Sequence, residues 1–351
     1  MTKHALSDIK VLDLTHLVAG PFCTKLLADY GADVIKIEKP VEGDKARKLG
    51  PFPYDRPDPG GSALFVFLNT NKKGVTLNLK TPEGVDIFKQ LAKQADVVVE
   101  NFRPGVMANL GLDYHTLERI NPKLVMTSIS NFGQSGPYKD YKATELVNEA
   151  MAGHMSTLGE GDREPIKHAG SQAQLHSGMV AAIGTLSAII YARLTGIGQH
   201  VDISIMEAES SMVQLKLMHY PYSGELDQRG SLSGYYPWGV FEAKDGYVSV
   251  SVHQVQWKRA GPWIGRPELA DDPRLRFPSE RLKHFEELDS IFLPWFLERT
   301  KREIVSSGQA NRIPVTPVNT PADMLSDPQF QAREFFVDID HPETGRFTCP
   351  G

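Results

Sequence analysis

The residues whose types suggest ligand chemistry follow three short apolar runs in the first third of the chain. These segments are His16–Phe22 (HLVAGPF), Glu38–Pro40 (EKP) and Glu100–Gly105 (ENFRPG). If the runs are parallel strands, the three segments lie at the carboxyl edge of one sheet, where open α/β sheets bind ligands. No G-x-G-x-x-G motif follows the first run, and Gly20-Pro21 does not replace it. A dinucleotide-dependent oxidoreductase is therefore only a weak alternative.

The apolar runs alternate with helical segments, which predicts a mainly parallel sheet covered on both faces. Helices are expected over Phe22–Tyr30 and from Pro82 to about Gln94, where Thr81 is the N-cap. The predicted strands are Ile9–Leu14, Asp33–Ile37, Val75–Leu79, Asp96–Glu100, Leu124–Ser130 and His200–Ile205. We interpret the fold as α/β, with a doubly wound, Rossmann-like large domain.

The rest of the chain predicts a long apolar helix and a second, smaller α/β domain. Gln172–Leu194 is expected to be a helix packed deep in the large domain, because its most apolar part is shorter than the roughly 20 residues of a membrane span. A hairpin is expected over Gly239–Val252, turning at Lys244-Asp245-Gly246. The expected division is a large domain over 1–205, a helix and linker over 206–235, a small domain over 236–328, and a segment over 329–351 that returns to the large domain.

Composition restricts the classes of function. The formal net charge of −5 disfavours a general nucleic-acid binder. Two cysteines, Cys23 and Cys349, cannot form a disulfide framework and suit a reducing compartment. The first residues lack the apolar core of a signal peptide. We expect a cytoplasmic protein without a membrane anchor, and we predict no metal site.

Several motifs occur in one order and spacing that resembles the family III CoA-transferases, which include formyl-CoA transferase and the carnitine dehydratase-like proteins. They span about the first 200 residues. The motifs are Leu12–Phe22, Leu27–Glu38, Gly43-Asp44, Asn69–Gly74, Asp96–Gly105 and Gly196–Asp202. The resemblance implies a dimer, of identical or related chains, whose subunits interlock like rings. It also implies that family chains run past residue 351, so that the segment closing the ring is incomplete here.

The resemblance also implies a binding site for coenzyme A and its thioesters, which act as substrates, with no tightly bound cofactor. Binding CoA requires cations for the phosphates, an apolar slot for adenine and a narrow channel for the pantetheine arm. The residues at the matching positions are Leu17, Val18, Ala19, Lys39, Leu77, Lys80, Asn101, Phe102, Arg103 and Lys142. Leu77 and Phe102 could equally be core residues, and the cations could be solvated surface charges. Asn109 departs from the family pattern, which often has Arg there.

Gln174 is the main departure from the family. The resemblance implies an aspartate four residues before a glycine of the long helix, and here that glycine is Gly178 and the position holds Gln174. In the family, the aspartate attacks the donor thioester and forms an anhydride, which the released CoA thiolate converts into an aspartyl-CoA thioester. A neutral amide is a far weaker nucleophile. We therefore expect Gln174 to be inactive.

Four interpretations follow. We favour a non-catalytic subunit paired with an aspartate-bearing relative, as in heteromeric members such as the benzylsuccinate CoA-transferase of anaerobic toluene breakdown, which would use succinyl-CoA as donor and an aromatic succinate as acceptor. Alternatively, Gln174 is an engineered replacement, or Glu145, Glu149 or His176 has taken over the chemistry. In the fourth interpretation, the chain binds CoA esters without transferring them. The aromatic segment Tyr220–Phe241 could contact a bulky acyl group but is better explained as a packed linker.

Overall fold

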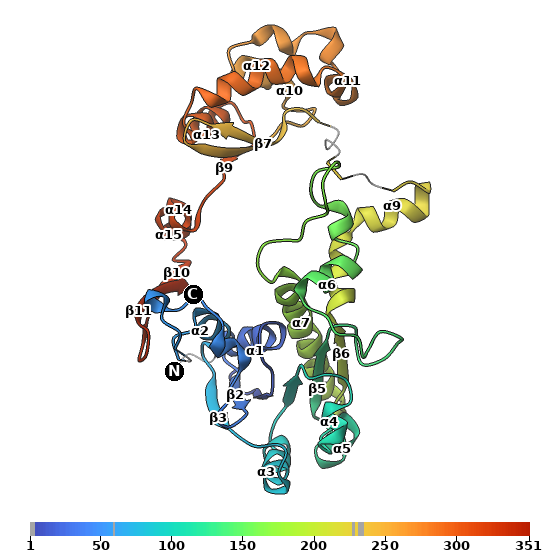
Figure 1. Cartoon of the computed structure of the whole chain (residues 1–351). Coiled ribbons are helices and arrows are strands. Elements are labelled where there is room, and N and C mark those ends of the chain that lie inside the picture. Colours follow the sequence, from blue (N-terminus) through green and yellow to red (C-terminus); the bar gives the residue numbers. More distant parts are fainter. Residues whose placement is uncertain (1–3, 59, 227–228, 231–234) are drawn as a thin grey trace. The chain divides into compact units, whose positions relative to one another are not determined.

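The computed structural model describes residues 4–351 except 59, 227–228 and 231–234 (Figure 1). Contacts divide the chain into two compact units. The first contains the chain up to Arg229 together with Ile339–Phe347, and the second contains Gly230–Asp338 and Thr348–Gly351. The change of unit at Gly230 falls within the expected linker 206–235, part of which lies outside the described residues. The short helix at the start of that linker belongs to the first unit, because it packs on two helices of that unit.

The first unit is built on a six-stranded sheet, which confirms the predicted α/β fold. The strand order is β3-β2-β1-β4-β5-β6, and each neighbouring pair is parallel. The strands are β1 (Lys10–Asp13), β2 (Asp33–Glu38), β3 (Lys73–Thr76), β4 (Val97–Glu100), β5 (Val125–Ser130) and β6 (His200–Ser204). The strand order reverses between β1 and β4, so the loops after these two strands border the crevice where doubly wound sheets bind ligands.

Helices cover both faces of this sheet (Figure 1). On one face, α1 (Ala19–Asp29) and α7 (Gln172–Thr195) pack against Val11, Val97 and Val125. On the other face, α3 (Pro82–Ala92) and α5 (Tyr114–Ile120) bury Phe88 and Leu117 against the same strands. The remaining helices of the unit are α2 (Ala63–Asn69), α4 (Val106–Asn109), α6 (Glu145–Met151), α8 (Ile205–Ser210) and α9 (Leu215–Ser223).

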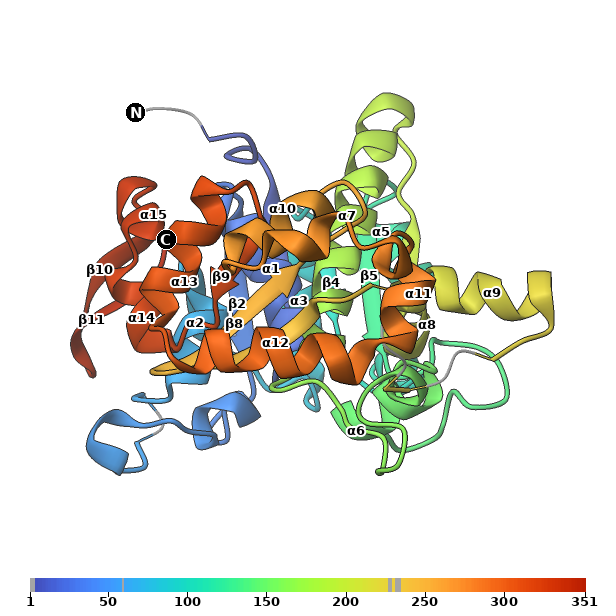
Figure 2. The same cartoon turned by 90° about the horizontal axis from the view of Figure 1, so that it is seen from above.

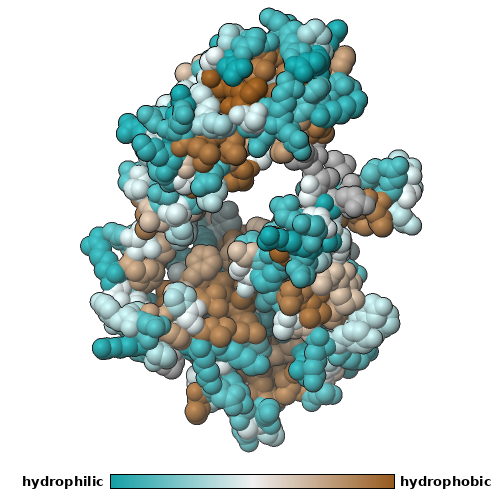
Figure 3. All heavy atoms as spheres, turned by 45° about the horizontal axis from the view of Figure 1, so that its top comes forward, coloured by the Kyte–Doolittle hydropathy of each residue, from teal (hydrophilic) through white to brown (hydrophobic). Residues whose placement is uncertain are grey.

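The expectation that the long helix is packed deep inside the domain is wrong. One side of α7 packs on α1 and the sheet, but the opposite side is exposed in the single chain. Its exposed apolar side chains are Met179, Ile183, Ile190, Tyr191 and Leu194. Figure 3 shows the surface of the chain by hydropathy, with brown, apolar areas among teal, hydrophilic ones. By length and composition alone, α7 is also the one helix of the described chain that could cross a membrane. Core helices of soluble proteins pass the same test.

A glycine sets the close approach of α7 to α1. A Cβ added at Gly178 would lie 2.6 Å from the Ala19 backbone oxygen, whereas one at Gly184 would meet side chains, of which the nearest is Val201 at 3.1 Å. We expect Gly178→Ala to lower the free energy of unfolding by about 1–3 kcal/mol, because the backbone cannot move as easily as a side chain. Gly184→Ala is the matched control and should have the smaller effect in urea denaturation. Equal losses would contradict this account of the contact.

Two helical stretches of the chain are interrupted. In the first, α8 and α9 are separate helices, because Gln214 has a positive φ of 49°. In the second, α11 ends at Lys283 and α12 begins after His284, whose backbone is not helical. Neither interruption involves a glycine, but α11 carries the basic residues Arg281 and Lys283 in its last turn, which is one of the sequence signals of a helix end.

The second unit holds a three-stranded sheet of order β7-β8-β9 with helices around it. The predicted hairpin is confirmed: β7 (Trp238–Ala243) pairs antiparallel with β8 (Gly246–Ser251), and Gly246 has a φ of 138°. Helix α12 (Phe285–Leu297) packs on β7 and lies in front of β8 in Figure 2. The other elements are α10 (Trp257–Trp263), α11 (Pro278–Lys283), α13 (Lys301–Ala310), β9 (Val315–Pro317), α14 (Pro321–Ser326) and α15 (Pro328–Ala332). The last residues form a separate two-stranded sheet of β10 (Phe336–His341) and β11 (Gly345–Pro350).

Candidate functional site

Asn101 joins the two loops at the point where the strand order reverses. The His16 backbone N–H donates to Asn101 Oδ1 over 2.9 Å, and Asn101 Nδ2 donates to the His16 carbonyl over 2.7 Å. His16 follows β1 and Asn101 follows β4, so one amide side chain satisfies both backbone groups of the facing loop. The sequence therefore places a rigid connection at the expected ligand crevice.

A buried ion network shapes the loop after β1. Leu17 has a positive φ of 66°, which is strained for a residue with a side chain, and its N–H donates to Asp44 Oδ1 over 3.0 Å. The other oxygen of Asp44 lies 2.9 Å from Lys36 Nζ, which also donates to the Thr15 carbonyl over 2.8 Å. The side chains of Lys36 and Asp44 are almost completely buried. Asp44 thus holds Leu17 in its unusual conformation through buried, charge-assisted hydrogen bonds.

A second buried pair lies beneath the same loop. Asp13, at the end of β1, accepts a hydrogen bond from Lys72 Nζ at 3.0 Å. Burial alone would raise the pKa of Asp13, but Lys36 and Lys72 hold it well below its usual range. Burial lowers the pKa of Lys72 to about 8. Lys72 also donates to the Pro21 carbonyl, so it connects the strand end to the first turn of α1.

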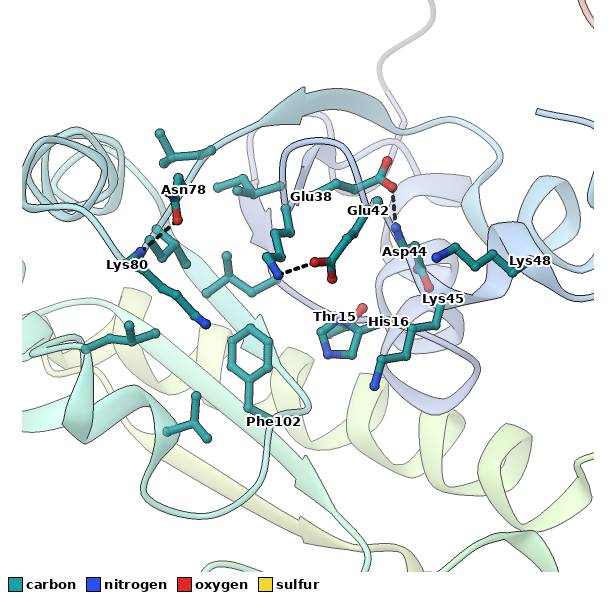
Figure 4. Close-up of a pocket in the computed structure, with 18 residues that line it drawn as sticks. Thr15, His16, Glu38, Glu42, Asp44, Lys45, Lys48, Asn78, Lys80 and Phe102 are labelled. Atoms are coloured by element: carbon teal, nitrogen blue, oxygen red, sulfur yellow. Dashed lines mark hydrogen bonds and ion pairs between the residues drawn. The ribbon is translucent and has the colours of Figure 1, made fainter. Parts of the chain in front are cut away.

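The first cavity, of ≈ 380 Å³, opens beside the loop after β2 (Figure 4). Leu77, Leu79, Phe102 and Leu110 give it an apolar wall, and Lys39, Lys45, Lys48 and Lys80 line it with cations. In Figure 4, Lys80 and Lys45 reach towards Phe102 and His16 from opposite sides. Among the predicted site residues, Lys39, Leu77, Lys80 and Phe102 meet here.

The cations of the first cavity differ in their partners. Lys39 Nζ lies 2.5 Å from Glu42 Oε1. Lys45, Lys48 and Lys80 form no ion pair with any residue in the described part of the chain. Three positive charges are therefore available to an anion, while a fourth is already paired.

The second cavity, of ≈ 670 Å³, shares Phe102 and Val106 with the first. The two cavities therefore adjoin at these two residues, and Asn101 lines the second of them. The predicted site residues that line the second cavity are Leu17, Ala19, Asn101, Phe102, Arg103, Lys142 and Gln174. Val18, the residue directly before α1, has a buried side chain and lines neither cavity.

Gln174 lies in the first turn of α7, beside a carboxylate. Glu145 Oε1 accepts the Ala173 N–H over 2.7 Å, so this carboxylate occupies the N-terminus of α7. Burial raises the pKa of Glu145, and the neighbouring Glu149 raises it further. Glu145 Oε2 is buried without a hydrogen-bond partner and lines the second cavity together with Gln174.

Some site residues were not predicted from the sequence. His16, Lys45 and Lys48 line the first cavity, but the sequence analysis assigned no role to them. The run Asp44–Lys48 carries a signal that could have indicated them, because three cations follow a turn after a strand. The Asp44 side chain caps the short 3-10 helix Lys45–Lys48 by accepting the Ala46 N–H, which fixes the direction of that run.

Glu100, at the end of β4, should make the stability of the chain depend on pH. Its carboxylate is 3% exposed and accepts the Phe102 N–H over 2.7 Å. Burial raises its pKa from 4.5 to about 7. The stability that protonated Glu100 contributes is complete below the unfolded pKa and is lost as the pH rises through about 7.

We therefore expect Glu100→Gln to stabilise the chain at pH 8 and to change little at pH 4. The difference in unfolding free energy should approach, but not exceed, about 3 kcal/mol, because each pKa unit corresponds to 1.36 kcal/mol. Thermal unfolding of both proteins between pH 4 and 9 measures it, with the exposed Glu160→Gln as control. Parallel stability curves for the natural chain and Glu100→Gln would contradict the burial argument.

Comparisons with known proteins identify the family of the chain. The family model of CoA-transferase family III matches residues 6–351. The chain is 38% identical to a formyl-CoA:oxalate CoA-transferase of Streptomyces avermitilis, covering 100% of this chain and 89% of the relative. It is 33% identical to the beta subunit of a succinyl-CoA–L-malate CoA-transferase of Chloroflexus aurantiacus, covering 97% and 84%. A crystal structure of a CAIB/BAIF family protein from Brucella suis matches with a TM-score of 0.87 and 31% identity, covering 99% and 95%. The chain therefore belongs to CoA-transferase family III, whose members use CoA thioesters as substrates.

Proposed function

We propose that this chain binds a CoA thioester along the two adjoining cavities and serves as the subunit of a CoA-transferase that is not itself acylated. The observation that carries the proposal is that a cationic, partly apolar cavity adjoins a second cavity whose lining includes Gln174. CoA has the same order of groups: a charged nucleotide, then a narrow arm, then the thioester. The donor and acceptor would be carboxylic acids, for example succinyl-CoA and an aromatic succinate.

The nucleotide would occupy the first cavity. Its apolar wall of Leu77, Leu79 and Leu110 suits the flat adenine ring. Lys45, Lys48 and Lys80 suit the phosphates, since they have no competing ion pair among the described residues. Lys39 would have to leave Glu42 before it could contribute.

The pantetheine arm would pass Asn101 and Phe102 into the second cavity. The Asn101 side chain already forms two hydrogen bonds with the His16 backbone. It would therefore hold the channel wall in place and would not itself hydrogen-bond the ligand. Leu17 and Ala19 would contact the thiol end, and Arg103 and Lys142 would attract the acyl carboxylate.

The chemistry at the thioester distinguishes this chain from the aspartate-bearing members. A carboxylate oxygen would attack the thioester carbon and expel the CoA thiolate, giving a mixed anhydride. The thiolate would then attack the carboxylate-derived carbonyl of the enzyme and expel the donor acid. Gln174 has no anionic oxygen and cannot follow this route. In the proposed assembly, a related chain supplies the missing carboxylate.

Two observations support a second chain. The apolar side of α7 and the residues Leu217, Met218 and Tyr220 of α9 are exposed in the single chain, and exposed apolar surface of this kind marks protein interfaces. A family relative is itself named as a beta subunit. We infer an interlocked dimer or a larger heteromer in which the partner is an aspartate-bearing relative, in the reducing environment of the cytoplasm.

A homomeric enzyme is the second candidate, because Glu145 lines the same cavity as Gln174. Its carboxylate would replace the missing nucleophile. Burial raises the pKa of Glu145 and so disfavours its anion, although the Ala173 N–H opposes this shift, and one oxygen of the carboxylate is already occupied by that hydrogen bond. Both features favour the first candidate.

The proposal is tested by purifying the chain from its own cells and from a heterologous host. We expect co-purification with an aspartate-bearing family chain from its own cells, and CoA transfer from succinyl-CoA only in that preparation. The isolated chain should still bind one CoA in a calorimetric titration. Full transferase activity from a homodimer would refute the non-catalytic assignment, and absence of CoA binding would refute the proposed site.

A further inference from the structure

A cluster of three histidines and two glutamates lies in the first unit, one helical turn beyond Glu145. Glu149 belongs to α6, His154 follows that helix, and His168 lies in the loop that leads to α7. His176 belongs to α7 and Glu209 to α8. Five separate segments of the chain thus converge on one point, and none of these side chains lines the cavities assigned to CoA.

The side chains of the cluster face one another at close range. His154 Nδ1 lies 2.6 Å from Glu209 Oε1, and the rings of His154 and His168 are 4.4 Å apart. His168 Nδ1 lies 3.4 Å from Glu149 Oε2, and His176 Nδ1 lies 3.9 Å from Glu209 Oε2. One possible ligand atom from each of His154, His168 and Glu209 fits within a span of 4.8 Å.

The cluster has buried negative charge without a cationic side chain to balance it. The side chains of Glu149 and Glu209 are 0% and 3% exposed. Within the described part of the chain, the recorded ion-pair partners of both are histidines only, not lysine or arginine. Burying an unpaired carboxylate is costly, and a bound cation would balance these two groups.

Several polar atoms of the cluster also lack a hydrogen-bond partner. They are Glu149 Oε1, His168 Nδ1 and His176 Nδ1, and each of these atoms is buried. Buried polar atoms normally have a hydrogen-bond partner, and a site for a bound ion is one recognised reason for an exception. Glu149 is fully buried and is not one of the three possible ligands, so its unpaired oxygen is a second, independent observation.

We propose that His154, His168 and Glu209 bind a divalent transition-metal ion of the Zn²⁺ type. Two imidazoles and one carboxylate form a donor set that zinc uses in proteins, with water at the fourth position. Zinc ligands at about 2.0–2.2 Å in a tetrahedron stand about 3.3 Å apart. His154 and Glu209 therefore separate slightly on binding, and His168 moves inward.

Glu149 acts as a positioning residue in this site. Its carboxylate faces His168 Nδ1 and accepts the His168 backbone N–H over 2.9 Å. In the metal-bound state, a hydrogen bond from His168 Nδ1–H to this carboxylate would direct the other ring nitrogen towards the metal. His168 thus presents Nε2 to the ion, while His176 stands beside the second oxygen of Glu209.

The ion would connect the loop before α7 to α6 and α8. That loop leads from His168 into the first turn of α7, where Gln174 lies. Metal binding would therefore stabilise the approach to the candidate site without touching CoA. This inference stands independently of the proposed function, because it concerns other side chains and needs no turnover to test.

The test uses the full chain without an affinity tag, stripped with a chelator and titrated with ZnCl2 by calorimetry. We expect one Zn²⁺ per chain and a higher Tm in its presence, since a ligand of the folded state stabilises it. His168→Ala should abolish this binding, and Glu149→Gln should weaken it by about 10–100-fold. His115→Ala removes an exposed histidine outside the cluster and should bind as the natural chain does.

The outcomes decide the proposal in either direction. Loss of zinc in His168→Ala with retention in His115→Ala supports it, provided that both variants unfold cooperatively in chelator. Equal zinc binding by the two variants would assign the ion elsewhere and overturn it. The absence of zinc binding by the natural chain also overturns it. If His168→Ala does not fold, His154→Gln gives the same readout.

Discussion

Gln174→Asp should give the chain the ability to form a covalent CoA adduct. The new carboxylate would lie in the first turn of α7, at the wall of the second cavity, where the natural side chain is an amide. Attack on succinyl-CoA, followed by return of the thiolate, would leave an aspartyl-CoA thioester. The gain should be large, because removing a nucleophile costs other enzymes on the order of 10⁶ in kcat. Intact-protein mass spectrometry would detect a species heavier by CoA less water.

The control for this prediction is Gln174→Asn, which makes the same change of length without an anion. We expect no adduct on that variant and unchanged CoA affinity for both. Because Glu145 lies beside position 174, the yield from Gln174→Asp should fall at low pH, where two adjacent carboxyls do not both ionise. An adduct on neither variant, with CoA binding intact, would show that position 174 is not aimed at the thioester.

Removing the unpaired cations of the first cavity should weaken CoA binding strongly. We expect Lys45→Ala combined with Lys80→Ala to raise the Kd by at least about tenfold, and by about 100-fold or more if both contact phosphate. Charged hydrogen bonds contribute about 1.5–3 kcal/mol each, and 1.4 kcal/mol is a factor of ten. Lys39→Ala should have a smaller effect, because its ammonium group is already paired with Glu42. Titration calorimetry with CoA measures all three.

Two controls separate phosphate binding from a general loss of charge. Lys93→Ala removes an exposed cation that lines neither cavity, and should leave the Kd unchanged. Dephospho-CoA, which lacks the 3′-phosphate, should bind the natural chain more weakly and should lose less on mutation. If the double variant and Lys93→Ala weakened CoA equally, the first cavity would not be the nucleotide site.

Most of the first unit could be predicted from the sequence, because its strands are buried on both faces. Runs such as Val97–Glu100 and Val125–Ser130 are buried along their whole length, and continuous apolar runs of this kind indicate parallel strands. The edge strand was placed two residues too late, since Lys73–Thr76 is exposed along its length and carries no apolar pattern. The break at Gln214 could not be predicted, because residue types there do not signal a helix end, and at His284 the only signal is the pair of basic residues Arg281 and Lys283 in the last turn of α11.

The candidate site was predicted from the order and spacing of several motifs, not from any single residue. Leu17, Asn101 and Gln174 were identified from this order and spacing, and all three line one cavity in the structure. Lys45 and Lys48 were missed because a lysine alone does not reveal whether it is solvated or faces a ligand. The histidine and glutamate cluster was missed for another reason: its members are up to 60 residues apart in the sequence, from Glu149 to Glu209, and only folding brings them together. The interlocked dimer stays a prediction.

The most direct test of the account is the mass of the natural chain after incubation with succinyl-CoA. The isolated chain should bind the thioester and keep its unmodified mass, and hydroxylamine should leave every acidic residue unchanged. When an aspartate-bearing partner chain is added, the adduct should form on the partner alone. A CoA or hydroxamate adduct on Glu145, or on any other acidic residue of this chain, would contradict the claim that its chemistry belongs to another polypeptide.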